Sequence, residues 1–183
     1  MADYAFPTVV QPSLPVADMT PLERLILGYV FEAENDGDRI TYCSCEGPCE
    51  FICVAIGDLR VAWRGSRDRG ESAIGGHVAA LLARFDPERG ENVRETIDID
   101  LTEAAISWDR MLQDIVRRSA TIHEIEVTAS FTCSKMRPDG FGGSAMLITA
   151  DAIRYKSTTD IFEEFWNEAD KARNANFSPA VGA

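Results

Sequence analysis

The sequence predicts an α+β fold, in which a mostly antiparallel sheet of about five to six strands carries about four helices packed mainly on one face. Three observations lead to this prediction. Segments with a helical pattern are separated by hairpin-like pairs of strands, and not by single strands in strict βαβ alternation. Strand-like segments alternate apolar with polar residues, which is typical of a sheet with one face in water. The length of 183 residues is close to that of one ordinary domain.

The N-terminal segment is predicted to be an extended arm over residues 1–19. It contains three prolines separated by small and β-branched residues: Pro7, Pro12 and Pro15. This composition favours an extended chain over a helix. We expect the arm either to be disordered or to dock on the domain, which spans residues 20–174. Residues 175–183 contain Asn, Ser and Pro and are expected to form a flexible C-terminal tail.

The first helix is predicted from its amino-terminal cap. Thr20 is suited to cap the helix, Pro21 occupies the first helical position, and Glu23 completes a capping box. Apolar residues then recur at helical spacing until a run of Asn, Asp and Gly residues at 35–38 stops the pattern. The sequence therefore predicts a helix over residues 21–34.

Three further helices are predicted from apolar stripes at helical spacing. They cover residues 74–85, residues 108–118, and a C-terminal segment that begins near Ser157 or Thr158. The paired glycines at 75–76 weaken the first turn of the earliest of the three. The stripe of the C-terminal helix consists of Ile161, Phe162, Phe165, Trp166 and Ala169.

The strands are predicted from alternation and from turn residues. The first three are expected to form a β-meander, at residues 39–45, 51–56 and 59–63. Residues 96–101 alternate cleanly, which predicts a strand buried on one side. The longest strand is expected within residues 121–133, and its hairpin partner at 145–153 follows a long, glycine-rich loop.

The composition limits the partners that the protein would bind. The formal net charge is −12, from 30 acidic and 18 basic residues. A field of this sign repels nucleic acid and anionic lipid, so we expect no direct nucleic-acid binding, and it favours solubility or a basic partner. No stretch approaches the ~18 consecutive apolar residues of a membrane helix. The N-terminus lacks the parts of a secretory signal, so the protein is expected in the cytoplasm, without membrane association.

Four of the five cysteines crowd into one short segment: Cys43, Cys45, Cys49 and Cys53. An odd number and such crowding do not resemble a secreted disulfide framework, so reduced thiols are the simplest interpretation. Four thiolates have the ligand chemistry for zinc or an iron–sulfur cluster, but their spacing fits no standard motif. Cysteines that fill strand positions as small apolar residues are the favoured interpretation, with metal binding as the alternative.

Two pairs of acids lie on the polar faces of predicted strands, with His123 alongside the second pair: Asp98 and Asp100, then Glu124 and Glu126. If these strands were neighbours with aligned polar faces, the four carboxylates could hold Mg²⁺ or Mn²⁺ and activate water for phosphodiester hydrolysis. The plainer interpretation is a solvated sheet surface decorated with charge.

Two further features are candidates for contact with a partner. The loop at Phe141, Gly142 and Gly143 is predicted to be a hairpin turn and not a phosphate-binding loop, because no lysine follows at the required spacing. An exposed Phe141 at its tip would contact a partner. Trp63 and Arg64 belong to an arginine cluster with the cation and stacking groups that a nucleotide contact uses, although a solvated loop with salt bridges is favoured.

No catalytic motif emerges from these residues. Together with the charge, this favours a non-enzymatic interaction protein that binds a protein partner or a second copy of itself. A divalent-metal-dependent hydrolase using the strand-face carboxylates is the first alternative, and a metal-binding protein built on the cysteine cluster is the second. No cofactor is predicted for the favoured function. Zinc, magnesium or manganese would be bound only under one of these two alternatives.

Overall fold

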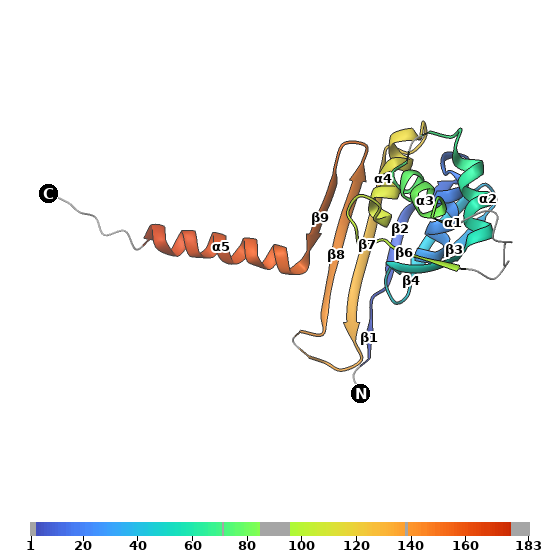
Figure 1. The fold of residues 1–183 in the computed structure, drawn as a ribbon. Helices are drawn as coiled ribbons and strands as arrows, with labels where there is room; N and C mark the ends of the chain where they lie inside the picture. The colour runs from blue at the N-terminus through green and yellow to red at the C-terminus, as the bar shows by residue number, and fades with distance from the viewer. Residues whose placement is uncertain (1–2, 71, 85–95, 138, 177–183) are drawn as a thin grey trace.

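The computed structural model describes residues 3–70, 72–84, 96–137 and 139–176. Within these residues the fold is α+β, as predicted, with nine strands and five α-helices. Every strand pair is antiparallel. Figure 1 shows a tall sheet with a group of helices beside it and one long helix that leaves the sheet in a different direction.

Seven strands form the main sheet, in which neighbouring strands are hydrogen-bonded. Their order across the sheet is β3 (Glu32–Asp36), β4 (Arg39–Ser44), β2 (Thr8–Pro15), β7 (Glu124–Cys133), β8 (Phe141–Thr149) and β9 (Ile153–Ser157), and the short β1 (Tyr4–Ala5) pairs with the far end of β7. The β7–β8 hairpin extends past the group of helices at its β1 end (Figure 1).

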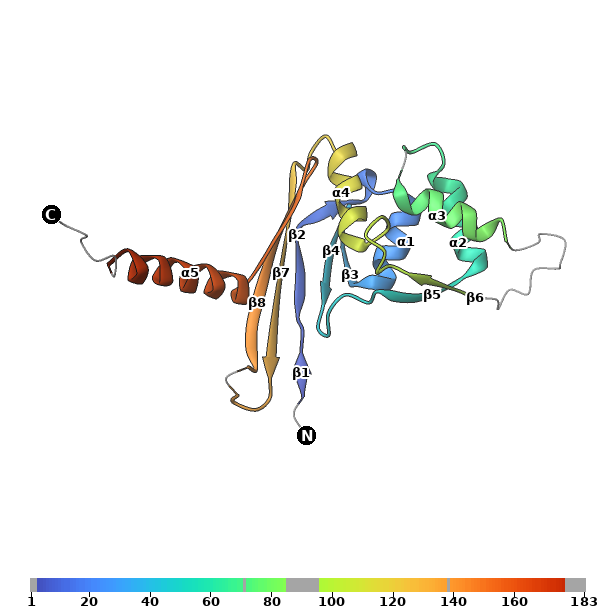
Figure 2. The same cartoon turned by 60° about the vertical axis from the view of Figure 1, so that its left-hand side comes forward.

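Four helices lie on one side of this sheet, with α2 and α3 farther from it than α4, as Figure 2 shows: α1 (Pro21–Val30), α2 (Ile56–Ser66), α3 (Ala73–Leu82) and α4 (Trp108–Arg118). Helix α4 packs directly on β7 and β8. Apolar side chains of both layers form a single core cluster, which includes Leu112 and Ile115 from α4 and Ile125, Val127 and Ile148 from the sheet. The predicted helices at 74–85 and 108–118 correspond to α3 and α4, except that residue 85 lies outside the described residues.

The N-terminal segment is extended, but it lies inside the sheet and not beside it. Strand β2 runs between β4 and β7, and its Val10 and Leu14 are 1% and 0% exposed. A boundary between arm and domain at residue 19 would therefore pass through the core. The chain accepts Pro12 here because the β2–β4 register shifts between Val10 and Leu14, which interrupts the hydrogen-bond ladder at the proline.

The first predicted helix is too long at its carboxyl end. Helix α1 ends at Val30, and residues 32–36 form β3, which pairs with β4 across a turn at Gly37. The φ of Gly37 is 61°, a left-handed conformation that favours glycine. The predicted cap is present: Glu23 N–H donates to Thr20 Oγ1 at 3.2 Å, and Thr20 N–H donates to Glu23 Oε2 at 2.9 Å.

The predicted meander is wrong in its pairing and in its third strand. Strand β5 (Phe51–Ala55) does not continue from β4, because it pairs with β6 (Thr96–Asp100) in a separate two-stranded sheet. Residues 59–63 lie within α2, where Ile56, Leu59 and Ala62 are buried at helical spacing. The one-sided burial expected for the strand at 96–101 is confirmed in β6, whose two isoleucines are buried between exposed polar residues.

The glycines predicted to lie in a loop belong to β8. This strand begins at Phe141 and pairs with β7 along its length. A Cβ added at Gly142 would overlap the Phe131 ring, so only glycine lets that ring lie across the strand. The return strand predicted at 145–153 is in fact divided between β8 and β9, which are joined by a turn in which Thr149 N–H donates to the Ala152 carbonyl at 2.9 Å.

The last helix, α5 (Thr158–Asn176), forms where it is predicted but does not pack into the core. It leaves the end of β9 and points away from the sheet and from helices α1 to α4 (Figures 1 and 2). Its side chains from Phe162 to Asn174 are exposed. The part of the predicted tail at 177–183 lies outside the described residues. No helix among the described residues is long and apolar enough to cross a membrane.

Candidate partner-binding surface

Helix α5 begins directly at the end of β9, with no residue between strand and helix. Ser157 caps it: Asp160 N–H donates to Ser157 Oγ at 3.1 Å, while the hydroxyl and the N–H of Ser157 each donate to Asp160 Oδ2 at 2.7 Å. These hydrogen bonds hold the pKa of the Asp160 carboxyl below its ordinary value. The first turn is therefore firmly closed, and a carboxylate there also suits the helix dipole.

Two further contacts fix the direction in which α5 leaves the sheet. Lys156 Nζ on β9 lies 2.6 Å from Glu164 Oε2, in the second turn of the helix. Gly143 N–H on β8 donates to Thr158 Oγ1 at 3.3 Å. Both contacts join the base of α5 to the last two strands of the sheet, and beyond them the helix continues outward (Figure 1).

The α5 stripe, as we name it here, is the apolar face of this helix: Ile161, Phe162, Phe165, Trp166, Ala169 and Ala172. Its aromatic members Phe162, Phe165 and Trp166 are 55%, 57% and 63% exposed. Phe162 stacks on Trp166 with ring centroids 6.2 Å apart and meets Phe165 edge-on at 6.5 Å. The rings contact one another but leave most of the stripe in water, which is typical of a surface that packs against another molecule.

Phe141 is a second exposed aromatic residue, at the start of β8. It is 47% exposed and lies opposite Thr132 on β7, at the end of the hairpin that extends past the helices. Its neighbours Gly142 and Gly143 are explained by the sheet, because Cβ atoms there would meet the Phe131 ring and the Ala129 carbonyl. Of the predicted loop contacts, Phe141 alone stays a candidate for partner binding.

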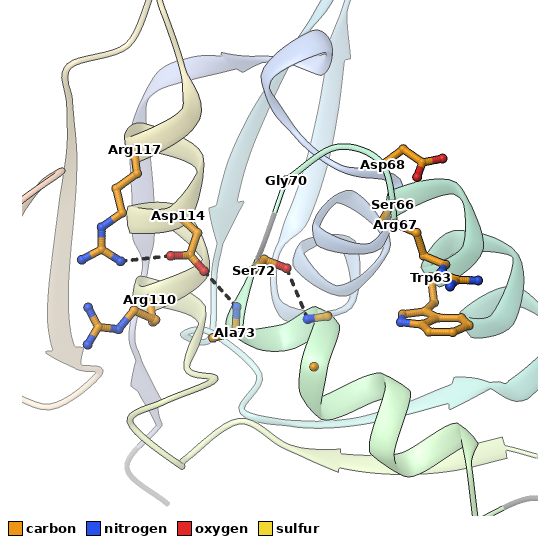
Figure 3. Close-up of a pocket in the computed structure, with 12 residues that line it drawn as sticks. Trp63, Ser66, Arg67, Asp68, Gly70, Ser72, Ala73, Arg110, Asp114 and Arg117 are labelled. Carbon is orange, nitrogen blue, oxygen red and sulfur yellow. Dashed lines mark hydrogen bonds and ion pairs between the residues drawn. The ribbon is translucent and has the colours of Figure 1, made fainter.

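Trp63 and Arg64 lie on α2, where Trp63 is half-buried and Arg64 is exposed. Trp63 borders a cleft of about 800 Å³ between α2, α3 and α4, shown in Figure 3. The guanidinium carbon of Arg67 lies 5.2 Å from the centroid of the Trp63 ring. Arg110 and Arg117 line the other side of the cleft, on α4 (Figure 3).

The amino end of α3 opens into this cleft but is already occupied. Asp114 Oδ2 accepts from Ala73 N–H at 3.2 Å, and Asp114 Oδ1 lies 3.1 Å from Arg117 Nη1. Ser72 Oγ accepts from Gly75 N–H at 3.2 Å. A carboxylate of the protein thus stands where an anionic ligand would bind a helix terminus. The amino end of α3 is therefore capped by side chains of the protein itself.

The structure does not bring the four strand-face carboxylates together. They lie in different sheets, two on β6 and two on β7: Asp98 and Asp100, then Glu124 and Glu126. All four are exposed, as is His123. Asp100 instead accepts from the hydroxyl of Thr102 at 2.7 Å and from its N–H at 2.9 Å, which lowers the pKa of Asp100. The shared metal site considered from the sequence lacks the geometry it requires.

The four clustered cysteines are also distributed over different elements: Cys43 on β4, Cys53 on β5, and Cys45 and Cys49 in the connection between them. Among the described residues, no three His, Cys, Asp or Glu side chains are grouped so that they could hold a metal ion. Desolvation, followed by the charges of Glu32 and Glu34, raises the pKa of the Cys43 thiol.

Sequence reasoning missed the exposure of the α5 stripe, although it identified every residue of the stripe except Ala172. Apolar residues at helical spacing predict an amphipathic helix, and this pattern is the same whether the apolar face meets its own core or another molecule. The sequence therefore carries no signal that separates the two cases.

Comparison of the chain with known protein families, curated proteins and solved structures finds no match.

Proposed function

We propose that this protein acts by binding another protein, and that α5 is the element that binds it. The observation that carries this proposal is the α5 stripe, in which Phe162, Phe165 and Trp166 are each more than half exposed. Keeping three neighbouring aromatic rings in water is unfavourable, and burial against a partner removes that cost. Binding of an amphipathic helix in a groove is a common mode of protein recognition, read through anchors at this spacing.

The charge of α5 supports a protein partner over a membrane or nucleic acid. The helix carries five acids and two bases: Asp160, Glu163, Glu164, Glu168 and Asp170, with Lys171 and Arg173. Helices that lie on membranes place Lys and Arg on the polar face, and nucleic acid likewise requires positive charge. An acidic rim around an aromatic stripe fits neither surface.

The alternatives from the sequence receive less support. The hydrolase would need carboxylates from β6 and β7 to converge, and these strands lie in different sheets. The cysteine-based metal protein would need side chains from β4, β5 and their connection to meet, and they are not grouped. We place the proposed activity in the cytoplasm, because five cysteines that stay free thiols fit a reducing compartment.

In-cell cross-linking followed by mass spectrometry tests the proposal. The wild type, Phe165→Glu and Asn167→Glu are each expressed in the cells that produce the protein. Asn167→Glu is the matched control, because it adds the same charge two residues away on the opposite, polar side of α5. We expect cross-links from α5 to a bound protein in the wild type and in Asn167→Glu, and their loss in Phe165→Glu.

Two results would contradict the proposal. One is a set of cross-links that persists unchanged in Phe165→Glu. The other is a set that maps only to elements other than α5 in all three proteins. Equal urea midpoints for the three proteins would show that loss of binding does not arise from unfolding.

A further inference from the structure

We infer that the protein bound by α5 is a second copy of this chain, and that the two α5 helices pair antiparallel about a two-fold axis that passes between Phe165 and Ala169. This inference rests on the proposed function, since it takes α5 as the binding element. It adds the identity of the partner and the register of the contact. Size and charge are distributed unevenly along α5, and both distributions favour this pairing.

The α5 stripe is large at its amino end and small at its carboxyl end. Phe162, Phe165, Ala169 and Ala172 follow the 3-4-3 spacing at which two helices interlock side chains. In an antiparallel pair centred on residue 167, Phe162 lies opposite Ala172 of the second copy and Phe165 lies opposite its Ala169. Each of these phenylalanines then fits beside an alanine. A parallel pair would instead place aromatic against aromatic and alanine against alanine.

Charge along α5 favours the same orientation. The amino half, residues 158–166, contains three acids and no base: Asp160, Glu163 and Glu164. The carboxyl half contains two acids and two bases, among them Lys171 and Arg173. Antiparallel pairing sets each acidic half beside a neutral half with exposed bases, whereas parallel pairing sets two acidic halves side by side. The helix dipoles are also opposed in the antiparallel arrangement.

The open face of the main sheet is a poorer partner for α5. Glu124 and Glu126 line a shallow hollow there together with Thr41, and Glu34 pairs with Thr41 across the β3–β4 ladder. The part of this face on β3 and β7 is acidic and would repel the acids of α5, while the bases of the face, Arg154 and Lys156, lie on β9, and Lys156 is already paired with Glu164. A second α5 stripe, by contrast, complements the first both in shape and in charge.

The area of the contact indicates how strong the pairing is. Each aromatic side chain offers about 150–250 Å² when fully buried, and the three in α5 are 55–63% exposed. Two sets of three aromatic side chains would then bury roughly 500–900 Å² in total, which is below the limit of about 1,000 Å² for stable specific interfaces and typical of a weak, transient one. We therefore expect a reversible dimer with a Kd on the order of 1–100 μM.

Sedimentation velocity tests the inference on the full chain, over protein concentrations from low micromolar to near-millimolar. We expect the wild type and Asn167→Glu to pass from monomer to dimer over this range, and Phe165→Glu to stay monomeric. A wild type that stays monomeric at every concentration would overturn the inference. Urea midpoints of the three proteins should agree, because the α5 stripe lies outside the core cluster.

An exchange of large and small residues tests the register. Phe165→Ala places alanine against alanine, and Ala169→Phe places phenylalanine against phenylalanine, so each should weaken the dimer at least tenfold. The double variant restores one large and one small residue in each layer and should recover an affinity within about threefold of the wild type. Failure of the double variant to recover while both single variants weaken the dimer would overturn the antiparallel register.

These outcomes separate the inference from the proposed function. A monomeric wild type, combined with cross-links from α5 to a different protein that Phe165→Glu abolishes, would overturn the inference and leave the proposed function standing. A monomeric wild type with no α5-dependent cross-link would overturn both.

Discussion

The guanidinium of Arg118 donates to both carboxylate oxygens of Glu23, at 2.7 and 2.5 Å, and the Glu23 side chain is fully buried. This pair joins the first turn of α1 to the last residue of α4, 95 positions apart in the chain. The same carboxylate also completes the capping box with Thr20. Gly70 makes room for the pair, since a Cβ at that position would lie 2.8 Å from Arg118 Cδ.

We predict that Glu23→Gln lowers the free energy of unfolding by about 3 kcal/mol, because it leaves the charge of Arg118 partly buried without its counter-ion. Equilibrium unfolding in urea measures this change. Glu163→Gln is the matched control, since the same chemical change on the exposed face of α5 should alter stability by less than about 0.5 kcal/mol. Equal losses in the two variants would show that the ion pair does not stabilise the contact between α1 and α4.

Local chemistry explains which parts of the fold could be predicted. The start of α1 follows from three neighbouring residues, and their predicted hydrogen bonds are present. The strand at 96–101 follows from strict alternation, because each position reports its own side of the sheet. Residues 59–63 mislead because Val61 and Trp63 suit a strand, while the burial of Ile56, Leu59 and Ala62 that makes α2 depends on the other helices.

Pairing over long distances could not be predicted. Strand β5 pairs with β6 more than forty residues later, and β2 enters the sheet between strands that come after it in the chain. The residues of a strand do not specify which other strand it pairs with. The sequence was therefore compatible with β6 and β7 as adjacent strands, with their acids side by side. The exposure of the α5 stripe could not be predicted for the same reason, because it depends on whether another element of the fold packs against the stripe.

We predict that Tyr42 makes stability fall in alkaline solution. Tyr42 is 1% exposed and donates a hydrogen bond to Met19 Sδ at 3.6 Å, and its burial raises its pKa from 10.0 to about 12. Since the folded pKa lies above the unfolded value, this contribution is fully present below pH 10. It is then lost between pH 10 and about 12, at about 1.4 kcal/mol per pH unit.

Urea unfolding of the wild type and Tyr42→Phe at several pH values from neutral to strongly alkaline measures this effect. The wild type should lose more stability than the variant as the pH rises above 10, because phenylalanine cannot ionise. Absorbance of tyrosinate should show one late-titrating group that the variant lacks. Parallel stability curves for the two proteins would refute the assignment to Tyr42.

We predict that divalent metals leave the thermal midpoint unchanged. A ligand that binds only the folded protein must raise its stability, so a zinc site on the cysteine cluster or a manganese site on the strand-face carboxylates would raise the midpoint. The four cysteines are spread over β4, β5 and their connection, and the four carboxylates are divided between β6 and β7. Neither set is grouped as a metal site requires. The measurement is a thermal scan with excess Mn²⁺, with Zn²⁺ under anaerobic conditions, and with a chelator.

Serine substitution of the four clustered cysteines provides the control for the zinc measurement. A rise in the midpoint with Zn²⁺ that disappears in the serine variant would restore the cysteine-based alternative. A rise with Mn²⁺ that Asp98→Asn or Glu126→Gln abolishes would restore the hydrolase.

We predict that Asp160→Ala unfolds the first turns of α5 while the rest of the protein keeps its stability. The Asp160 carboxylate accepts two hydrogen bonds from Ser157, and α5 has few other contacts with the sheet. Loss of these hydrogen bonds weakens the start of the helix, which matters more for α5 than for a helix held by the core. Hydrogen exchange should therefore accelerate about fivefold over residues 158–166, with no change in the core strands.

Asp170→Ala is the matched control for this cap, because it removes the same charge near the carboxyl end of α5, where a carboxylate does not stabilise the helix dipole. Acid should reproduce the effect in the wild type. Because Ser157 holds the pKa of Asp160 below its ordinary value of 3.8, the capping contribution is fully present above that pH and is lost as the pH falls through the folded value. Equally fast exchange over residues 158–166 in both variants would show that the hydrogen bonds between Ser157 and Asp160 do not stabilise the first turn of α5. The base of the helix would then be held by the ion pair of Lys156 with Glu164 and by the contact of Thr158 with β8.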